Sequence, residues 1–395
     1  MKKETKKAPT IRFRGFTDDW EQRKLGEIFT ERSEKKHEYL PPLTIIQGCG
    51  TVRRDEMDRE LIYDKSSLSN YKLVKKNDFI VHLRSFEGGL EKSNIEGIVS
   101  PAYHIFHGEK INTEFYYSFF RSNDFINHKL VPFVYGIRDG RSIDIAGMKT
   151  IKIPYPSVNE QNRIGTLIGQ LNSLIALHQR KLAQLKKLKK YFLQNMFPAK
   201  GEKVPRIRFK GFTGDWEQRK LGDFGAVAMC KRIFKDQTSE KGDIPFYKIG
   251  TFGGVPDAYI PRELFNEYKQ MYPYPEKGDI LISASGSIGR TVEYTGEDAY
   301  FQDSNIVWLR HDKSIVNLFL KYLYEVIQWA GIEGSTIKRL YNDNILTTEV
   351  MIPSVQEQEK IGAYLDSIDH LITLHQRKLD QLQTMKKFML QNMFI

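Results

Sequence analysis

The sequence predicts a mixed α/β (α+β) fold with two similar globular domains, separated by an antiparallel coiled coil of two long helices and related by a pseudo-twofold axis. Three observations predict it. The chain has 395 residues, which is too long for one ordinary core. A framework segment occurs twice, at offsets of 196 and 197 residues. Each copy of the framework ends in a long stretch with the apolar spacing of a coiled coil.

The first part of the repeated framework is nearly identical in its two copies. It reads IRFRGFTDDWEQRKL at 11–25 and IRFKGFTGDWEQRKL at 207–221, with 13 of 15 positions the same. An internal repeat of this kind is a stronger indication of the overall architecture than any local sequence pattern. We expect Trp20 and Trp216 within it to be buried anchors rather than rings that stack on a ligand.

Between the framework segments lie two inserts of nearly equal length with little common sequence. One correspondence remains, because KKNDFIVHLRS at 75–85 aligns with EKGDILISASG at 276–286. Short β-rich runs, turn residues and a helical stretch predict an α+β domain of about 130 residues in each insert. The strands are expected at 79–83, 280–282 and 305–309, and the helices near 112–122 and 315–329. The inserts are therefore expected to share a fold and to differ at their surfaces.

Each insert is followed by the same helix-start signal. The first reads PSVNE and ends at Glu160, and the second reads PSVQE and ends at Glu357. In such a capping box the Ser hydroxyl accepts a hydrogen bond from the third helical N–H group, and the Glu side chain reaches back to the Ser N–H. The signal predicts helices that start at Ser157 and Ser354.

After each cap, apolar residues recur in alternating steps of four and three, which is the period of a coiled-coil seam. The candidate interface residues are Ile164, Ile168, Leu171, Ile175, His178, Leu182, Leu185, Ile361, Leu365, Ile368, Ile372, His375, Leu379 and Leu382. Each helix should run for about 38 residues, or roughly 57 Å. A second apolar stripe includes Leu174, Leu177 and Leu188, matched by Leu371, Leu374 and Met385. Because one partner helix cannot cover both stripes, further helices from another subunit are expected.

Polar residues at seam positions have two possible roles. His178 and His375 could be metal ligands, but a polar seam residue more commonly fixes the register of a coiled coil at a cost in stability. Lys189 and Lys386 also occupy seam positions, and we expect both to extend to solvent.

These patterns divide the chain into four parts. Residues 1–155 hold the N-terminal segment and the first insert domain, and residues 156–200 hold the first long helix. Residues 201–352 hold a linker and the second insert domain, and residues 353–395 hold the second long helix.

Composition narrows the class of protein. The formal net charge of +11 favours a polyanionic partner, since Lys and Arg gain free energy by displacing counterions from phosphate. Cys49 and Cys230 lack metal-ligand spacing, so neither a disulfide framework nor a zinc site is expected. No apolar run approaches the roughly 20 residues that a membrane-spanning helix needs. The basic start is not followed by an apolar stretch, so no signal peptide is expected and a cytoplasmic location follows.

Loops of the inserts place Arg, Lys, Ser, Asn or Tyr beside Gly, a mixture suited to phosphates and base edges. The candidate DNA-binding residues are Arg53, Arg54, His82, Arg84, Ser85, Tyr135, Arg138, Arg141, Lys231, Arg232, Lys248, Ser285, Ser287, Arg290, Lys338, Arg339, Tyr341 and Asn342. For each of them singly, a solvated or ion-paired role is an equally good interpretation.

Two diverged inserts, each followed by a near-identical capped long helix, resemble the specificity subunits of type I restriction-modification enzymes along essentially the whole chain. In that family each insert is a target recognition domain that reads one half of a split DNA sequence, and the helices form an antiparallel spacer that sets the gap. The resemblance implies two modification subunits that carry S-adenosylmethionine and methylate adenine. It also implies two restriction subunits that use ATP and Mg to cleave DNA.

The resemblance implies no catalysis and no cofactor in this chain, and the motifs agree. An Asn-Pro-Pro-Tyr or Asp-Pro-Pro-Tyr methyltransferase signature is absent, and GSIGRT at 286–291 lacks the spacing of a phosphate-binding loop and is interpreted as a turn. Two other classes remain as alternatives: a self-contained nuclease or methyltransferase with its own reader, and a purely structural coiled-coil scaffold. Sequence-specific retention of duplex DNA together with partner subunits distinguishes the main interpretation from both.

Overall fold

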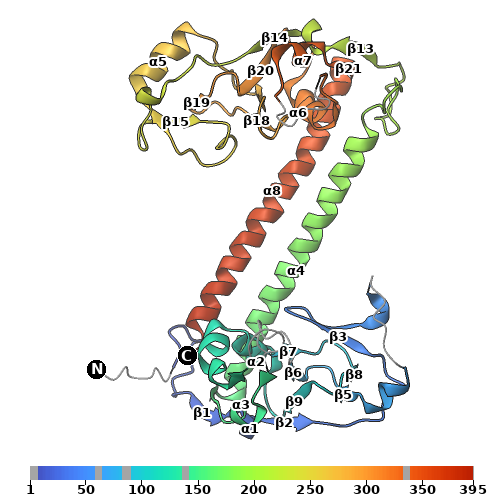
Figure 1. Cartoon of the computed structure of the whole chain (residues 1–395), viewed down its shortest axis with the longest axis vertical. Helices are drawn as coiled ribbons and strands as arrows, with labels where there is room; N and C mark the ends of the chain where they lie inside the picture. Colours follow the sequence, from blue (N-terminus) through green and yellow to red (C-terminus); the bar gives the residue numbers. More distant parts are fainter. Residues whose placement is uncertain (1–7, 58–64, 82–89, 136–141, 332–338, 395) are drawn as a thin grey trace. The chain divides into compact units, whose positions relative to one another are not determined.

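The computed structural model describes residues 8–57, 65–81, 90–135, 142–331 and 339–394 (Figure 1). The chain forms two compact units. The first unit comprises Met1–Gln179 with Arg377–Ile395, and the second comprises Arg180–Gln376. In the described part of the chain, no helix combines the length and the apolar character needed to cross a bilayer.

The first unit is built on antiparallel strands. Its main sheet has the order β2-β9-β6-β7, from β2 (Phe29–Arg32), β9 (His104–Gly108), β6 (Phe79–Val81) and β7 (Glu91–Lys92). The smaller pairs are β1 (Glu21–Lys24) with β12 (Lys152–Tyr155), β3 (Leu43–Ile46) with β4 (Gly50–Arg53), β5 (Lys72–Val74) with β8 (Gly97–Val99), and β10 (Val134–Tyr135) with β11 (Ser142–Ile143). The α-helices are α1 (Leu25–Ile28), α2 (Thr113–Phe120), α3 (Ile145–Met148), the start of α4 (Val158–Asn195) and the end of α8 (Val355–Asn392).

The second unit has a main sheet of the order β14-β20-β17-β18, from β14 (Gly225–Ala228), β20 (Ile306–His311), β17 (Ile280–Ser283) and β18 (Thr291–Glu293). A second sheet has the order β16-β15-β19, from β16 (Tyr259–Ile260), β15 (Ile244–Tyr247) and β19 (Tyr300–Phe301), and β13 (Glu217–Lys220) pairs with β21 (Glu349–Ile352). The α-helices are α5 (Arg262–Met271), α6 (Asn317–Val326), α7 (Asn342–Thr347), the start of α8 and the end of α4.

Each insert has its own four-stranded main sheet, and the two sheets have corresponding strand orders. This agrees with the common fold that the sequence predicts for the inserts. The aligned segments 75–85 and 276–286 supply β6 and β17, which occupy the same place in the two strand orders. A turn with the same hydrogen bond precedes each strand: Asp78 Oδ2 accepts from the backbone N–H of Lys75 at 2.9 Å, and Asp279 Oδ2 accepts from that of Glu276 at 2.8 Å. Strands and helices lie at the positions expected in both inserts, except that residues 82 and 83 of the expected strand 79–83 lie outside the described residues.

The two long helices begin at their caps and each span 38 residues. The Ser157 hydroxyl accepts from the N–H of Glu160 at 3.3 Å, and the Ser354 hydroxyl accepts from that of Glu357 at 3.4 Å. The expectation that each Glu reaches back to its Ser is wrong. Both carboxylates instead accept hydrogen bonds from an arginine of the repeated segment, because a two-pronged charged pair is stronger than a hydrogen bond to a neutral amide.

Trp20 and Trp216 are the expected buried anchors, with 3% and 2% of their surfaces exposed. The indole N–H of Trp20 donates to Glu160 Oε2 at 3.1 Å. Each ring also makes an edge contact with a phenylalanine of the following insert, Phe115 for Trp20 and Phe319 for Trp216. The repeated segment therefore joins each insert to the start of a long helix.

In each unit the two long helices run in opposite directions. In the first unit, Ile164 near the start of α4 lies in the same core as Met393, just beyond the end of α8. In the second unit, Ile361 near the start of α8 lies in the same core as Met196, just beyond the end of α4. The antiparallel arrangement predicted from the repeat is thus present in both units.

Most of the predicted seam is buried. The buried seam residues are Ile164, Ile168, Leu171, Leu182, Ile361, Leu365, Ile368, Leu379 and Leu382, and the remaining five are half-buried. Lys189 corrects one expectation, because it does not extend to solvent. Its ammonium lies 2.9 Å from Glu325 Oε1 and 2.9 Å from Asp369 Oδ2, and these carboxylates provide more favourable partners than the open side of the helix.

Candidate nucleic-acid interface

The turn before β20 brings three of the candidate residues of the second insert together. Arg232 Nε lies 2.9 Å from Asp303 Oδ2, and Arg339 Nη2 donates to the carbonyl of Ser304 at 3.3 Å. The Ser285 hydroxyl donates to the side chain of the third turn residue, Asn305, at 2.8 Å. Ser285 and Arg339 also form a β-bridge. Segments more than a hundred residues apart in the chain therefore meet at one loop cluster.

A second turn holds Arg290 at the same cluster. The hydroxyl of Ser283 accepts from the N–H of Arg290 at 2.9 Å and donates to the carbonyl of Ser287. Gly286 and Gly289 adopt φ angles of +67° and +77°, which L side chains rarely adopt, so GSIGRT is the tight turn that the sequence predicts. The exposed Arg290 side chain is carried at the end of this turn.

Arg290 also lies against the loop that follows β15. A Cβ atom added to Gly253 would come within 3.1 Å of Arg290 Nη2, so a larger residue there would displace the guanidinium. Lys248, at the start of the same loop, forms an ion pair with Asp257 at 2.8 Å. The loops after β15 and β17 thus form one surface with the turn before β20.

Lys231 and Arg339 of the second insert lie beside aromatic rings. The Lys231 ammonium is 4.8 Å from the centre of the Tyr272 ring, and the Arg339 guanidinium is 5.7 Å from that of Tyr341. Tyr341 is 63% exposed and precedes Asn342, the first residue of α7. An exposed tyrosine next to an arginine offers a stacking face and a planar cation together.

In the first insert the described candidates are held in different ways. Arg53 is exposed and forms a two-pronged ion pair with Asp55 at 3.1 and 2.9 Å. Arg54 is half-buried, and its guanidinium is 5.6 Å from the centre of the Tyr71 ring. Tyr135 is 59% exposed on β10. Arg54 is therefore placed to support the loop, whereas Arg53 and Tyr135 face solvent.

Six candidates lie outside the described residues: His82, Arg84, Ser85, Arg138, Arg141 and Lys338.

Sequence reasoning missed the residues that organise the loop cluster. Asp303, Ser304 and Asn305 were not candidates, although an Asp-Ser-Asn sequence before a strand is a typical turn composition. Trp329 was also missed, and a Cβ atom added to Gly289 would come within 2.9 Å of its indole nitrogen. Asp303 is the one that composition could have revealed, because a loop rich in arginine needs a carboxylate to hold its side chains in place.

In the described loop cluster of the second insert we find neither a reactive thiol nor a metal site. Burial raises the pKa of the Cys230 thiol to about 12, so this group stays protonated. Among the described residues, no group of three or more His, Cys, Asp or Glu side chains is arranged to hold a metal ion. What the loop cluster offers is hydrogen-bond donors and positive charge.

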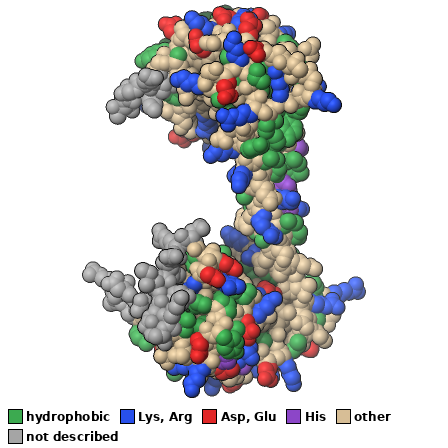
Figure 2. All heavy atoms as spheres, turned by 90° about the vertical axis from the view of Figure 1, so that its right-hand side faces the viewer, with side chains coloured by type: hydrophobic (Ala, Val, Ile, Leu, Met, Phe, Trp, Pro, Cys, Tyr) green, Lys and Arg blue, Asp and Glu red, His purple; other side chains and the backbone are tan. Residues whose placement is uncertain are grey.

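The long helices carry apolar side chains on the solvent side, in addition to the seam (Figure 2). In the first unit these are Leu174, Leu177, Met385 and Phe388, and in the second they are Leu371, Leu374, Leu188 and Tyr191, all between 41% and 55% exposed. We call them the first and second apolar faces. Residues of the two faces correspond pairwise at the repeat offset of 197, so each unit has an equivalent face.

Comparison with known proteins now decides the family. The family model of the type I restriction modification DNA specificity domain matches residues 17–187 and residues 213–384, which is most of the chain. This chain belongs to that family. It is a DNA specificity subunit of a type I restriction-modification system, and its two inserts are target recognition domains.

Individual relatives agree with the assignment of a specificity subunit. A protein of Haemophilus influenzae named as a type I restriction enzyme specificity subunit is 40% identical over 303 residues, which cover 75% of this chain and 76% of that protein. A Methanocaldococcus jannaschii protein named as the MjaX specificity subunit is 23% identical over 403 residues, covering 94% and 91%.

A solved structure agrees on the fold. The S subunit of a type I restriction-modification system from M. genitalium covers 98% of this chain and 99% of its own, at 16% identity and a TM-score of 0.65. Specificity subunits of this family select the DNA sequence and are not catalytic, and S-adenosylmethionine and ATP belong to other subunits.

Proposed function

We propose that each target recognition domain of this specificity subunit reads one half of a two-part, asymmetric target in double-stranded DNA. The observation that carries the proposal is that the two domains have the same order of strands in the main sheet but different side chains on their loops. A common scaffold with different loops is suited to two related recognition events with different bases.

The loop cluster of the second domain supports direct reading of bases. Arg290 and Arg339 are exposed at the surface, and Ser285 and Tyr341 lie beside them. The fork of an arginine matches the two acceptors of guanine in the major groove, and such a contact contributes about 1–3 kcal/mol of discrimination. The described candidate residues of this domain form the proposed interface, and Asp303 helps to organise it through its ion pair with Arg232.

The two equivalent apolar faces support binding of two modification subunits, one for each unit. Exposed Leu and Phe side chains on a helix favour a protein partner, because burial of apolar surface stabilises association by about 25 cal/mol per Å². The modification subunits would bring S-adenosylmethionine to an adenine in each half of the target, and two restriction subunits with ATP and Mg would complete the assembly in the cytoplasm.

The long helices are proposed to set the gap between the two halves of the target. Each helix begins in one unit and ends in the other, since α4 crosses the boundary after Gln179 and α8 crosses it after Gln376. A continuous helix has a fixed rise of about 1.5 Å per residue, so its length determines how far apart two attached readers can bind.

Exchange of one reader tests the proposal. Adenine methylation would be mapped across the genome of cells that express this chain with its modification subunit, and again after residues 26–155 are replaced by those of another family member. Because these residues lie within the proposed first domain, 1–155, we expect a two-part motif of which only one half changes. A motif without two parts, or a change in both halves, would contradict separate reading by the two domains.

A further inference from the structure

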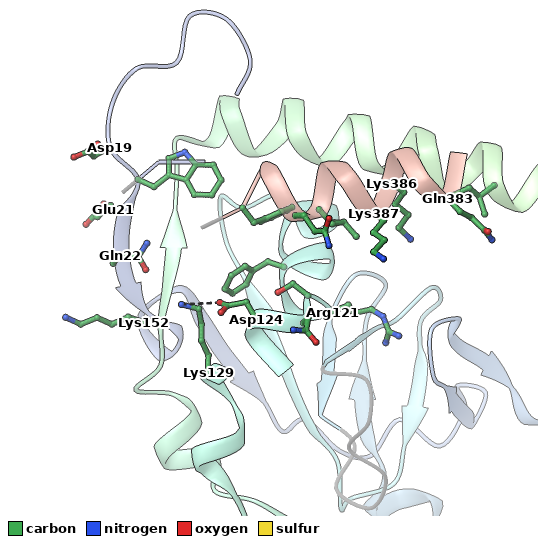
Figure 3. Close-up of a pocket in the computed structure, with 18 of the residues that line it drawn as sticks. Asp19, Glu21, Gln22, Arg121, Asp124, Lys129, Lys152, Gln383, Lys386 and Lys387 are labelled. Atoms are coloured by element: carbon green, nitrogen blue, oxygen red, sulfur yellow. Dashed lines mark ion pairs between the residues drawn. The ribbon is translucent and has the colours of Figure 1, made fainter. Parts of the chain in front are cut away.

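A cleft in the first unit lies between the target recognition domain and the last turns of α8. Its volume is about 1600 Å³. Arg121, which directly follows α2, lines one wall, and Lys386 and Lys387 of α8 line the other (Figure 3). Both Lys side chains extend from the helix toward the side of the cleft from which Arg121 projects (Figure 3). Three cations therefore converge on one space.

The equivalent lysine in the second unit has its charge compensated. Lys189 occupies the position of Lys386 at the repeat offset of 197, and it pairs with Asp369 of α8 and Glu325 of α6 at 2.9 Å each. The counterpart of Asp369 in the first unit is Asn172, which carries no charge.

The residue of the first unit that corresponds to Glu325 is Arg121, which carries the opposite charge. The correspondence follows from Phe115 and Phe319, which make equivalent edge contacts with Trp20 and Trp216. Six residues after these phenylalanines come Arg121 in the first unit and Glu325 in the second. The two carboxylates that neutralise Lys189 are thus replaced by an amide and an arginine around Lys386.

Among the residues that the structure describes, Lys386 consequently lacks a counter-charge. Among the described residues, no carboxylate lies within ion-pair distance of Lys386, which is half-buried. Arg121 is held by an ion pair with Glu91, and across the cleft Lys129 is paired with Asp124 at 3.5 Å. Burial and the nearby positive charge of Arg121 lower the pKa of Lys386 from its usual value.

The position of the cleft favours a nucleic acid over a protein as the source of that anion. The first apolar face is on another side of α8: Met385 and Lys387 are two residues apart and so point about 200° apart around the helix. On the other wall, the turn between β3 and β4 lies against Arg121, because a Cβ atom added to Gly48 would come within 3.5 Å of Arg121 Nη2. The same turn leads through β4 to the candidate Arg53.

We propose that this cleft binds a phosphate group of the DNA backbone, with Lys386 as the main contact and Lys387 beside it. The proposal rests on the function proposed above and adds an asymmetry to it. The first half of the target is gripped by a contact that does not depend on base sequence, and the corresponding lysine in the second unit is already satisfied within the protein.

The test measures DNA binding by the complete complex of this chain with its modification subunits. Two duplexes would be used, one with the mapped target and one without it, each titrated over a range of salt concentrations. We expect Lys386→Gln to weaken binding to both duplexes by about threefold to tenfold and to reduce the slope of log K against log salt by about 1. Lys386→Arg is expected to retain wild-type binding, since it preserves the charge.

Lys241→Gln is the matched control, because Lys241 is an exposed lysine of the second unit outside the cleft. It makes the same change in net charge and is expected to leave both affinity and slope unchanged. The proposal is overturned if Lys386→Gln binds both duplexes as the wild type does. It is also overturned if this variant loses modification subunits in native mass spectrometry, because the anion would then be a carboxylate of the partner. If the wild-type complex prefers neither duplex, the failure lies with the proposed function instead.

Discussion

Arg12 and Glu160 are separated by 148 residues in the sequence and form a two-pronged ion pair, with Arg12 Nε 2.6 Å from Oε1 and Nη2 2.8 Å from Oε2. The carboxylate is 1% exposed and also accepts the indole N–H of Trp20. Arg208 and Glu357 repeat the pair at 2.8 Å and 2.8 Å. The repeated segment is thus fastened to the first turn of each long helix by a buried charge pair.

Replacing the buried carboxylate should therefore destabilise the first unit. Glu160→Gln leaves the Arg12 guanidinium without its counter-charge in a largely buried position, and we expect a loss of about 3 kcal/mol in the free energy of unfolding. Urea-induced unfolding of the complex measures it. The control is Glu21→Gln, which removes a carboxylate paired with Arg23 at the surface, and it should leave the midpoint unchanged. Equal midpoints for both variants would show that the buried pair does not stabilise the unit.

Arg290 should determine part of the second half of the DNA target. Arg290→Ala removes an exposed guanidinium at the centre of the loop cluster, and a lost two-pronged base contact weakens discrimination by about 1–3 kcal/mol. We expect mapped methylation to become degenerate at one position of the second half while the first half stays the same. Arg262→Ala serves as the control, because Arg262 lies on the separate helix α5 and is paired with Asp298. An unchanged second half would exclude Arg290 as a base-reading residue.

The second apolar face should be required for one of two modification subunits. Leu371→Ser combined with Leu374→Ser removes two exposed leucines, and the lost apolar burial should reduce the number of bound modification subunits from two to one in native mass spectrometry. Gln381→Ser is a suitable control, because it lies one heptad beyond Leu374 and is already polar. Retention of both subunits by the double variant would contradict the assignment of this face.

Lengthening the helices should lengthen the unread gap in the target. A seven-residue insertion in both α4 and α8 keeps the seam in register and adds about 10 Å, or roughly three base pairs. We expect methylation mapping to show the same two half-sites with a longer gap. An unchanged gap would mean that contacts other than the helices set the spacing.

The two cysteines should differ sharply in reactivity. Cys49 is exposed and Cys230 is buried. Because burial raises the pKa of Cys230 to about 12, its thiolate form at pH 8 amounts to about one part in ten thousand. A thiol reagent such as Ellman's reagent is expected to modify Cys49 in the native protein and Cys230 after unfolding in urea. Rapid modification of both in the native state would contradict the packing around Cys230.

The elements predicted from the sequence are those in which local pattern and repetition agree. The caps at Ser157 and Ser354 and the heptads after them were both readable, since helix signals act over a few residues. The strands β6 and β17 were found because one short alignment survives between the inserts. The partners of Glu160 and Lys189 were not found, because each partner lies more than a hundred residues away in the sequence. The local pattern instead favoured a hydrogen bond from Glu160 back to Ser157 and an extension of Lys189 to solvent.

The candidate interface shows the same limit. Composition identified Arg232 and Arg339 as candidates, but sequence spacing carries no information on which loops of a sheet lie together. That they meet at the turn of Asp303 and Ser304 depends on the order of the strands. The opposite environments of Lys189 and Lys386 were likewise hidden, because identical framework residues acquire different neighbours from the diverged inserts.

One backbone hydrogen bond bears on how such a chain can be rearranged. In the second unit the N–H of Ile207 donates to the carbonyl of Asn195 at 2.8 Å, and the segment 196–206 joins the two directly. In the first unit the equivalent bond runs from Ile11 to Asn392 at 2.9 Å, across the whole length of the polypeptide. A linker as long as 196–206 between Asn392 and Ile11 would close the backbone into a ring. New ends opened within 196–206 would then yield a circular permutant whose two halves are translated in reverse order. The contacts that join each repeated segment to its long helices would be the same in both arrangements.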